Sequence, residues 1–171
     1  MLTDTIDKYL KLFKEASNTR ESSRLVKELN KEFETSPPSV SEVIQELEQY
    51  ASNPKHPGAS LVMSAAWNNL SKDYTPILCQ LLNNECHNGL HEPIVEILDV
   101  LRDERAVPAL SKALTYRWSY DIWFNVPRKS LLALAEIETP EAIMIITEAT
   151  QSSEELIRDD ANMILENLSI D

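Results

Sequence analysis

The chain has 171 residues, a formal net charge of −12 at pH 7, and only two glycines against nine prolines. This length suits a single domain with a continuous core, and so little glycine disfavours a sheet protein with many tight turns. The negative charge also disfavours nucleic acid as the main ligand, because phosphate binding requires cations that displace counterions.

The charge is uneven along the chain. Residues 1–57 hold eight Lys and Arg against ten Asp and Glu, whereas residues 58–171 hold eight against eighteen, a net charge of −10. A basic partner protein fits this distribution, although solubility alone also accounts for an acidic surface. Two cysteines and no N-terminal leader favour the reducing cytoplasm, and no apolar run reaches the ~18 residues of a membrane span.

The first 36 residues are predicted to form a capping pair of helices. Apolar residues at helical spacing predict one helix from Thr3 or Asp4 to Ala16. A second helix follows the Ser17-Asn18-Thr19 break, and its expected buried residues are Leu25, Val26, Leu29 and Phe33. Such a pair would cover the apolar end of a helical stack.

The middle of the chain has further helix-start signals. Ser39 and Glu42 form a capping box for a third helix. An apolar helix around Val62 and Ala66 follows, and Pro93 stands at a later helix start, where its missing N–H has little cost.

An internal repeat organises the second half. A shift of 36 residues places Leu101–Leu114 over Ile137–Thr150, and a shift of 32 places Pro108 on Pro76. A period of this size with two helices in each unit predicts a solenoid. We therefore divide the single domain 1–171 into the cap 1–36 and the repeats 37–72, 73–102, 103–138 and 139–171.

Residues 101–110 (LRDERAVPAL) and 128–143 (RKSLLALAEIETPEAI) resemble HEAT-like repeats of the bilin lyase type. The resemblance implies an all-α fold, a right-handed α-solenoid of antiparallel helix pairs with about ten helices and a concave face lined by inner helices. Asp103, Arg105 and Arg128 match family positions that tie one repeat to the next. In the last repeat, Thr139-Pro140-Glu141 replaces the Asp-x-Arg pair of this pattern.

An aromatic loop is the first candidate site. Five of the eleven aromatic residues fall between positions 116 and 124, in what looks like an insertion between two helices. Trp, Tyr and Arg dominate interface hot spots, so partner contacts are predicted for Tyr116, Arg117, Trp118, Tyr120 and Asp121. Trp123 and Phe124 are expected to fold back into the core.

Acidic rows on two helices are the second candidate. At helical spacing one row comprises Glu92, Glu96, Asp99 and Asp103, and the last helix carries another row of Glu155, Asp159 and Glu166. Like charges four residues apart repel by a few tenths of a kcal/mol, and a basic partner would remove that cost. Solvated faces of this kind are nevertheless common.

Cys79, Cys86, His87 and His91 do not follow a zinc-site spacing, so we expect no metal and no cofactor. The chain also lacks a phosphate-binding glycine loop, a Gly-x-Ser-x-Gly elbow and a His-Glu-x-x-His motif, so we expect no enzymatic activity.

The leading hypothesis is a monomeric binding protein for a basic partner, namely an immunity or inhibitor protein for a nuclease toxin. The alternatives are a bilin lyase-like chromophore-handling subunit and an adaptor in a larger assembly; a glycosylase would need a basic cleft.

Overall fold

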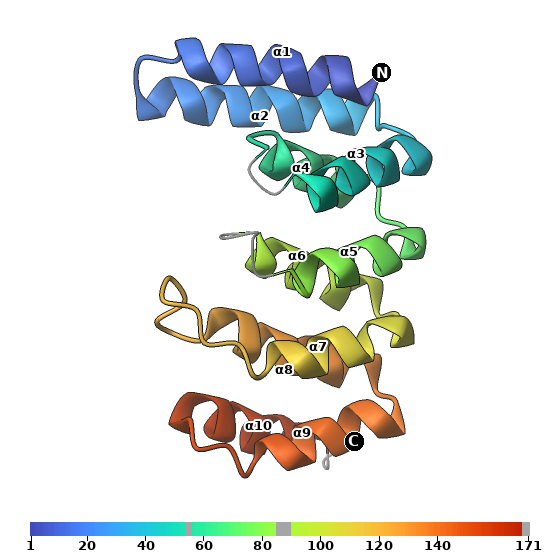
Figure 1. The fold of residues 1–171 in the computed structure, drawn as a ribbon, viewed down its shortest axis with the longest axis vertical. Helices are drawn as coiled ribbons and strands as arrows, with labels where there is room; N and C mark the ends of the chain where they lie inside the picture. The colour runs from blue at the N-terminus through green and yellow to red at the C-terminus, as the bar shows by residue number, and fades with distance from the viewer. Residues whose placement is uncertain (54–55, 85–89, 169–171) are drawn as a thin grey trace. The chain divides into compact units, whose positions relative to one another are not determined.

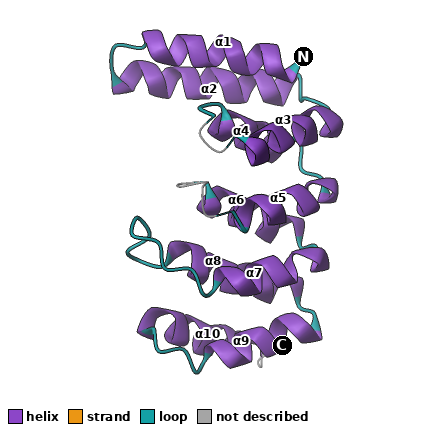
Figure 2. Ribbon diagram, viewed as in Figure 1, coloured by secondary structure: helices purple, strands orange, loops and turns teal. Residues whose placement is uncertain are grey.

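The computed structural model describes residues 1–53, 56–84 and 90–168, and within these ranges it contains ten α-helices and no strand (Figure 1, Figure 2). The predicted all-α fold of helix pairs is confirmed. The chain divides into a first unit, residues 1–77, and a second unit, residues 78–171.

The first unit contains two helix pairs and one short 3-10 helix. Its elements are α1 (Leu2–Glu15), α2 (Thr19–Thr35), α3 (Val40–Ser52), α4 (Ala59–Asn68) and η1 (Lys72–Tyr74). The helix α5 (Thr75–Leu82) begins in the last residues of the first unit and continues into the second unit.

Polar groups as well as apolar packing hold the first unit together. Ser39 and Glu42 form the predicted capping box at the start of α3, and Glu42 also accepts a hydrogen bond from the backbone N–H of Leu2 at 3.2 Å. Burial, followed by the adjacent Glu32 carboxylate, raises the pKa of Tyr9 to about 12.

Val26, expected to be buried, is 44% exposed. It lies about 100° around the helix from Leu25 and so falls outside the apolar stripe.

Gly58 is expected to tolerate no side chain. A Cβ at this buried position would lie 2.7 Å from the hydroxyl oxygen of Tyr50 and 2.9 Å from Cγ2 of Ile6, and both of those residues are almost fully buried. Gly58→Ala should therefore lower the free energy of unfolding by about 1–3 kcal/mol, the usual cost of overpacking. Urea denaturation measures the change, with the exposed Ser60→Ala as the matched control on the same helix. Equal stability of Gly58→Ala and the parent protein would contradict this packing.

The second unit is built around α8. Its other elements are α6 (His91–Leu101), η2 (Glu104–Ala106), α7 (Val107–Ala113), α9 (Pro140–Ala149) and α10 (Glu155–Leu168), with α8 itself at Asn125–Ile137. The helix α8 packs against α6, α7, α9 and α10. Leu98, Leu110 and Leu131 are fully buried in this core.

The repeat is visible in the turns of the second unit. The helices α6 and α8 both end at a left-handed residue, Arg102 (φ 47°) and Glu138 (φ 58°), 36 positions apart. The next residue in each turn caps the helix after it: Asp103 accepts from the N–H of Arg105 in η2, and Thr139 accepts from the N–H of Ala142 in α9. Thr139 therefore keeps the capping role of Asp103 although the sequence motif differs.

Candidate functional site

The aromatic loop, residues 114–124, joins α7 to α8 and is held against the start of α6 by His91. The fully buried His91 ring lies 2.7 Å from the Tyr120 hydroxyl through Nδ1 and 2.9 Å from the Asn84 carbonyl oxygen through Nε2. Because a carbonyl only accepts, Nε2 carries the hydrogen, and in the neutral ring Nδ1 accepts from Tyr120. The Trp118 ring stacks on His91 with a centroid separation of 3.8 Å. One histidine thus fixes two aromatic residues of the loop.

Two charged side chains anchor the rest of the loop. The Asp121 carboxylate is 7% exposed and accepts from the backbone N–H groups of Asn125 at 2.7 Å and Val126 at 2.9 Å, so it caps α8. The Arg117 guanidinium donates to the carbonyl oxygen of Leu114 at 2.9 Å and to the Glu154 carboxylate at 3.2 Å. The second bond holds the loop beside the start of α10.

These positions revise the predicted roles of the aromatic residues. Tyr116, predicted as a contact residue, is only 8% exposed, and its hydroxyl donates to the Asn83 side chain at 3.1 Å. Trp123, predicted to be core, is 64% exposed, and Ile122 is 68% exposed. The prediction for Trp123 was wrong: Tyr116 and Trp118 are the rings that pack against His91, and Trp123 stays at the surface. Phe124 is half-buried beneath the Arg117 guanidinium.

The large apolar side chains that the loop exposes are few and lie close together in sequence. We define the loop tip as Tyr120, Ile122 and Trp123, whose exposed fractions are 43%, 68% and 64%. Sequence reasoning missed Ile122, although its place between the capping residue Asp121 and Trp123 could have suggested a projecting turn. Arg117 and Asp121 hold the base of the loop through hydrogen bonds and are not part of the loop tip.

Most acids of the row on α6 form ion pairs with basic side chains of the same unit. Lys129 of α8 forms ion pairs with Glu92 at 2.6 Å and with Glu96. Burial alone would lower the pKa of Lys129, but the hydrogen bonds to these two carboxylates outweigh it and raise the pKa. The predicted free acidic ridge is therefore corrected to a bridge between α6 and α8.

The other two members of that row are also turned inward. The Asp103 carboxylate is 5% exposed and accepts from the backbone N–H and Nε of Arg105, both at 3.0 Å. Burial, followed by the nearby Glu136 carboxylate, raises the pKa of Asp99. The buried Oδ1 of Asp99 has no hydrogen-bond partner among the described residues. Neither side chain is an exposed contact group.

The row on α10 is exposed as predicted, and comprises Glu155, Asp159 and Glu166. Its neighbour Asp160 pairs with Arg128 of α8 at 2.6 Å, which is the tie between successive repeats implied for Arg128. Within the described part of the second unit, carboxylate partners are present for Arg102, Arg105, Arg117, Arg128, Lys129 and Arg158. Most of the unit's cations are thus used internally, and its surplus of carboxylates lies at the surface.

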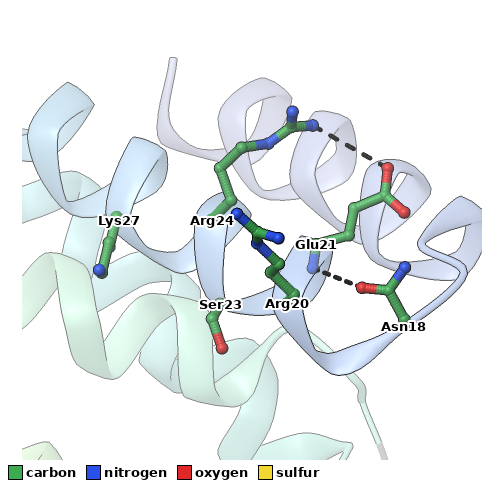
Figure 3. A pocket seen from close by; sticks show the side chains of 6 residues that line it. All are labelled: Asn18, Arg20, Glu21, Ser23, Arg24 and Lys27. Carbon is green, nitrogen blue, oxygen red and sulfur yellow. Dashed lines mark hydrogen bonds and ion pairs between the residues drawn. The ribbon is translucent and has the colours of Figure 1, made fainter.

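A surface hollow of about 640 Å³ lies along α2 in the first unit (Figure 3). Its lining residues are Asn18, Arg20, Glu21, Ser23, Arg24 and Lys27. The Asn18 side chain caps the helix by accepting from the N–H of Glu21, and Arg24 pairs with Glu28 at 3.4 Å. None of the six residues is buried, and Asn18, Glu21 and Arg24 make local helix contacts, so the hollow has no desolvated group suited to catalysis.

The structure offers no metal centre in the ranges it describes, where no group of three or more His, Cys, Asp or Glu side chains converges. Burial raises the pKa of the Cys79 thiol to about 11, so it is protonated at neutral pH and a poor nucleophile. Both ring nitrogens of His91 are engaged in hydrogen bonds. Cys86 and His87 lie outside the described residues.

None of the helices described combines the length and apolar character needed to cross a membrane.

Comparison with known proteins identifies the fold. No family model and no curated protein matches the chain. Among solved structures, human deoxyhypusine hydroxylase in complex with glycerol is similar, with a TM-score of 0.61 and 20% sequence identity over 79% of this chain. The match covers 46% of that enzyme, so the chain spans about half its length. The chain thus shares a HEAT-like helical repeat fold with that enzyme, and no family match names the bilin lyase type.

Proposed function

We propose that this chain is a non-enzymatic protein-binding module that recognises a basic partner protein. The observation that carries the proposal is the loop tip, where Ile122 and Trp123 are more than 60% exposed on a loop whose base is fixed by His91 and Asp121. Large apolar side chains held rigidly at the surface are characteristic of interface anchors.

Charge favours a basic partner. The Arg117–Glu154 pair holds the loop beside the start of α10, where Glu155 and Asp159 are exposed. Most cations of the second unit are already paired internally, so the surface carboxylates set the sign of its long-range field. Such a field accelerates association with a basic protein and makes the rate sensitive to salt.

Within this class we propose an immunity or inhibitor protein that neutralises a nuclease toxin. A nuclease surface is basic because it holds phosphates, and an acidic binder both steers to that surface and occupies it. Size and charge support this more specific role, as they did at the level of sequence.

The chromophore-handling alternative is less well supported by the loop. Trp118 is the best placed ring to grip a planar group, but it stacks on His91 at 3.8 Å and near Tyr120 at 5.6 Å with nearly parallel planes. The stacking surface of Trp118 is therefore occupied by His91 and Tyr120. An absorbance scan with added bilin tests this alternative. The similar hydroxylase shares the fold at 20% identity, which gives no support for transferring its activity.

The test pairs the protein with a basic nuclease domain encoded by a neighbouring gene. Calorimetry should give a saturable complex that weakens at higher salt, and Trp123→Ala should weaken it by about tenfold or more, as for an anchor residue. The doubly substituted Glu155→Lys/Asp159→Lys should slow association, whereas the control Glu141→Lys/Glu148→Lys on α9 should have a smaller effect. Unchanged affinity in Trp123→Ala would count against the loop, and no salt dependence would count against the electrostatic part.

A further inference from the structure

Three helices of the second unit run side by side in the same direction. Lys129, near the start of α8, pairs with Glu92 and Glu96 in the first half of α6, and Glu136, near the end of α8, pairs with Arg102 at the end of α6. On the opposite side of α8, the Arg128–Asp160 pair joins it to α10. The helix α8 therefore lies between α6 and α10.

Two exposed apolar residues occupy equivalent places on α8 and α10. Leu132 is one turn beyond Arg128, and Met163 is one turn beyond the Asp160 that Arg128 binds. Their exposed fractions are 49% and 51%. Because the helices are parallel and bridged one turn earlier, these side chains lie next to each other on one face. The equivalent position on α6, 36 residues before Leu132, holds Glu96.

Carboxylates border this apolar pair at both ends. On the α6 side, Glu96 shares Lys129 with Glu92, which leaves these three groups a net charge of −1, and the half-buried Asp99 carboxyl lies close to Glu96. On the far side of α10, Asp159 and Glu166 are exposed. We call the surface made by Glu96, Leu132 and Met163 the three-helix face. It is an apolar patch between two acidic borders.

We propose that the three-helix face binds an amphipathic basic helix of the partner, with apolar side chains on Leu132 and Met163 and Lys or Arg side chains over the acidic borders. Packed helices lie about 8–10 Å apart, and a helix rises 1.5 Å per residue. A helix laid across the face thus contacts neighbouring helices at intervals of about six or seven residues. The partner helix is expected to carry apolar residues at that interval, with basic residues before and after them.

This inference rests on the proposed protein-binding function and specifies the partner's binding element. Charge complementarity selects a basic helix over an acidic or neutral one, because Lys129 offsets only one of the two charges of Glu92 and Glu96, Arg128 is paired with Asp160, and Asp159 and Glu166 are exposed. An apolar patch bounded by fixed charges also sets the register of a bound helix, as in other helix-in-groove complexes.

The experiment uses a dye-labelled synthetic helical peptide of about 20 residues with two leucines about seven residues apart and lysines at both ends. Fluorescence anisotropy should show saturable binding to the full chain at low salt. The Leu132→Gln/Met163→Gln variant should bind about tenfold more weakly, as expected for lost apolar anchors. Met144→Gln is the control, since Met144 on α9 is 55% exposed and lies outside the three-helix face. Circular dichroism verifies that all variants fold.

The inference is overturned by no saturable binding of this peptide, by equal binding of a peptide with the same composition in scrambled order, or by unchanged binding to the doubly substituted variant. A peptide with glutamate in place of lysine should bind much more weakly, and equal binding would also overturn it. Trp123→Ala should leave peptide binding unchanged. If Trp123→Ala weakens binding of a partner protein and the peptide does not compete with that partner, the proposed protein-binding function is kept and the three-helix face is rejected as its site.

Discussion

Replacing His91 with alanine is expected to lower the free energy of unfolding by about 3–5 kcal/mol, the range for removing a large buried ring. The substitution removes the 3.8 Å stacking contact with Trp118 and both hydrogen bonds, to Tyr120 and to the Asn84 carbonyl. Urea denaturation measures the loss. Trp118 fluorescence should shift to longer wavelength in the native baseline, because its ring gains solvent contact.

His91→Phe separates the two contributions. Phenylalanine keeps an aromatic surface under Trp118 but has no nitrogen, so the two hydrogen bonds of His91 are lost at a cost of about 0.5–1.5 kcal/mol each. We expect the stability of His91→Phe to lie between those of the parent protein and His91→Ala. If His91→Ala is as stable as the parent, this histidine does not hold the aromatic loop.

Asp121→Ala is expected to destabilise the protein by about 2–3 kcal/mol. Its buried carboxylate accepts from the first two backbone N–H groups of α8, at Asn125 and Val126. Hydrogen bonds to a charged group contribute more than neutral ones, and loss of a helix cap alone costs up to about 2 kcal/mol. Thermal unfolding followed by circular dichroism gives the measurement.

Asp121→Asn is the conservative comparison. Its amide oxygen can still accept a hydrogen bond from one of the two N–H groups, so it should recover part of the lost stability. The exposed Asp159→Ala in the same unit should change stability by less than about 0.5 kcal/mol. Equal effects of Asp121→Ala and Asp159→Ala would contradict the capping role.

Helix periodicity and turn chemistry made most of the fold predictable. The Ser39 and Glu42 capping box forms as the sequence indicates, because its hydrogen bonds join residues only three apart. The 36-residue shift likewise anticipated the equivalent turns at Arg102 and Glu138. Local signals of this kind depend little on the rest of the chain.

The site was less predictable because its contacts come from different repeats. The acids Glu92 and Glu96 share a helix face as their spacing predicts, but Lys129, more than 30 residues later, pairs with both. The same applies to Tyr116, whose burial involves an edge contact with His91 of α6, whereas Trp123 is exposed. Composition identified the aromatic loop, whereas the choice of exposed ring required the tertiary partners.

The fixed base of the loop lowers the conformational entropy that the loop tip loses when it binds a partner. A flexible loop loses conformational entropy when it docks, and that loss subtracts from affinity. Here the bonds made by Arg117 and Asp121 have already ordered the backbone on both sides of the tip. Ile122 and Trp123 therefore enter a complex preorganised, so that more of the free energy from burying them remains as affinity.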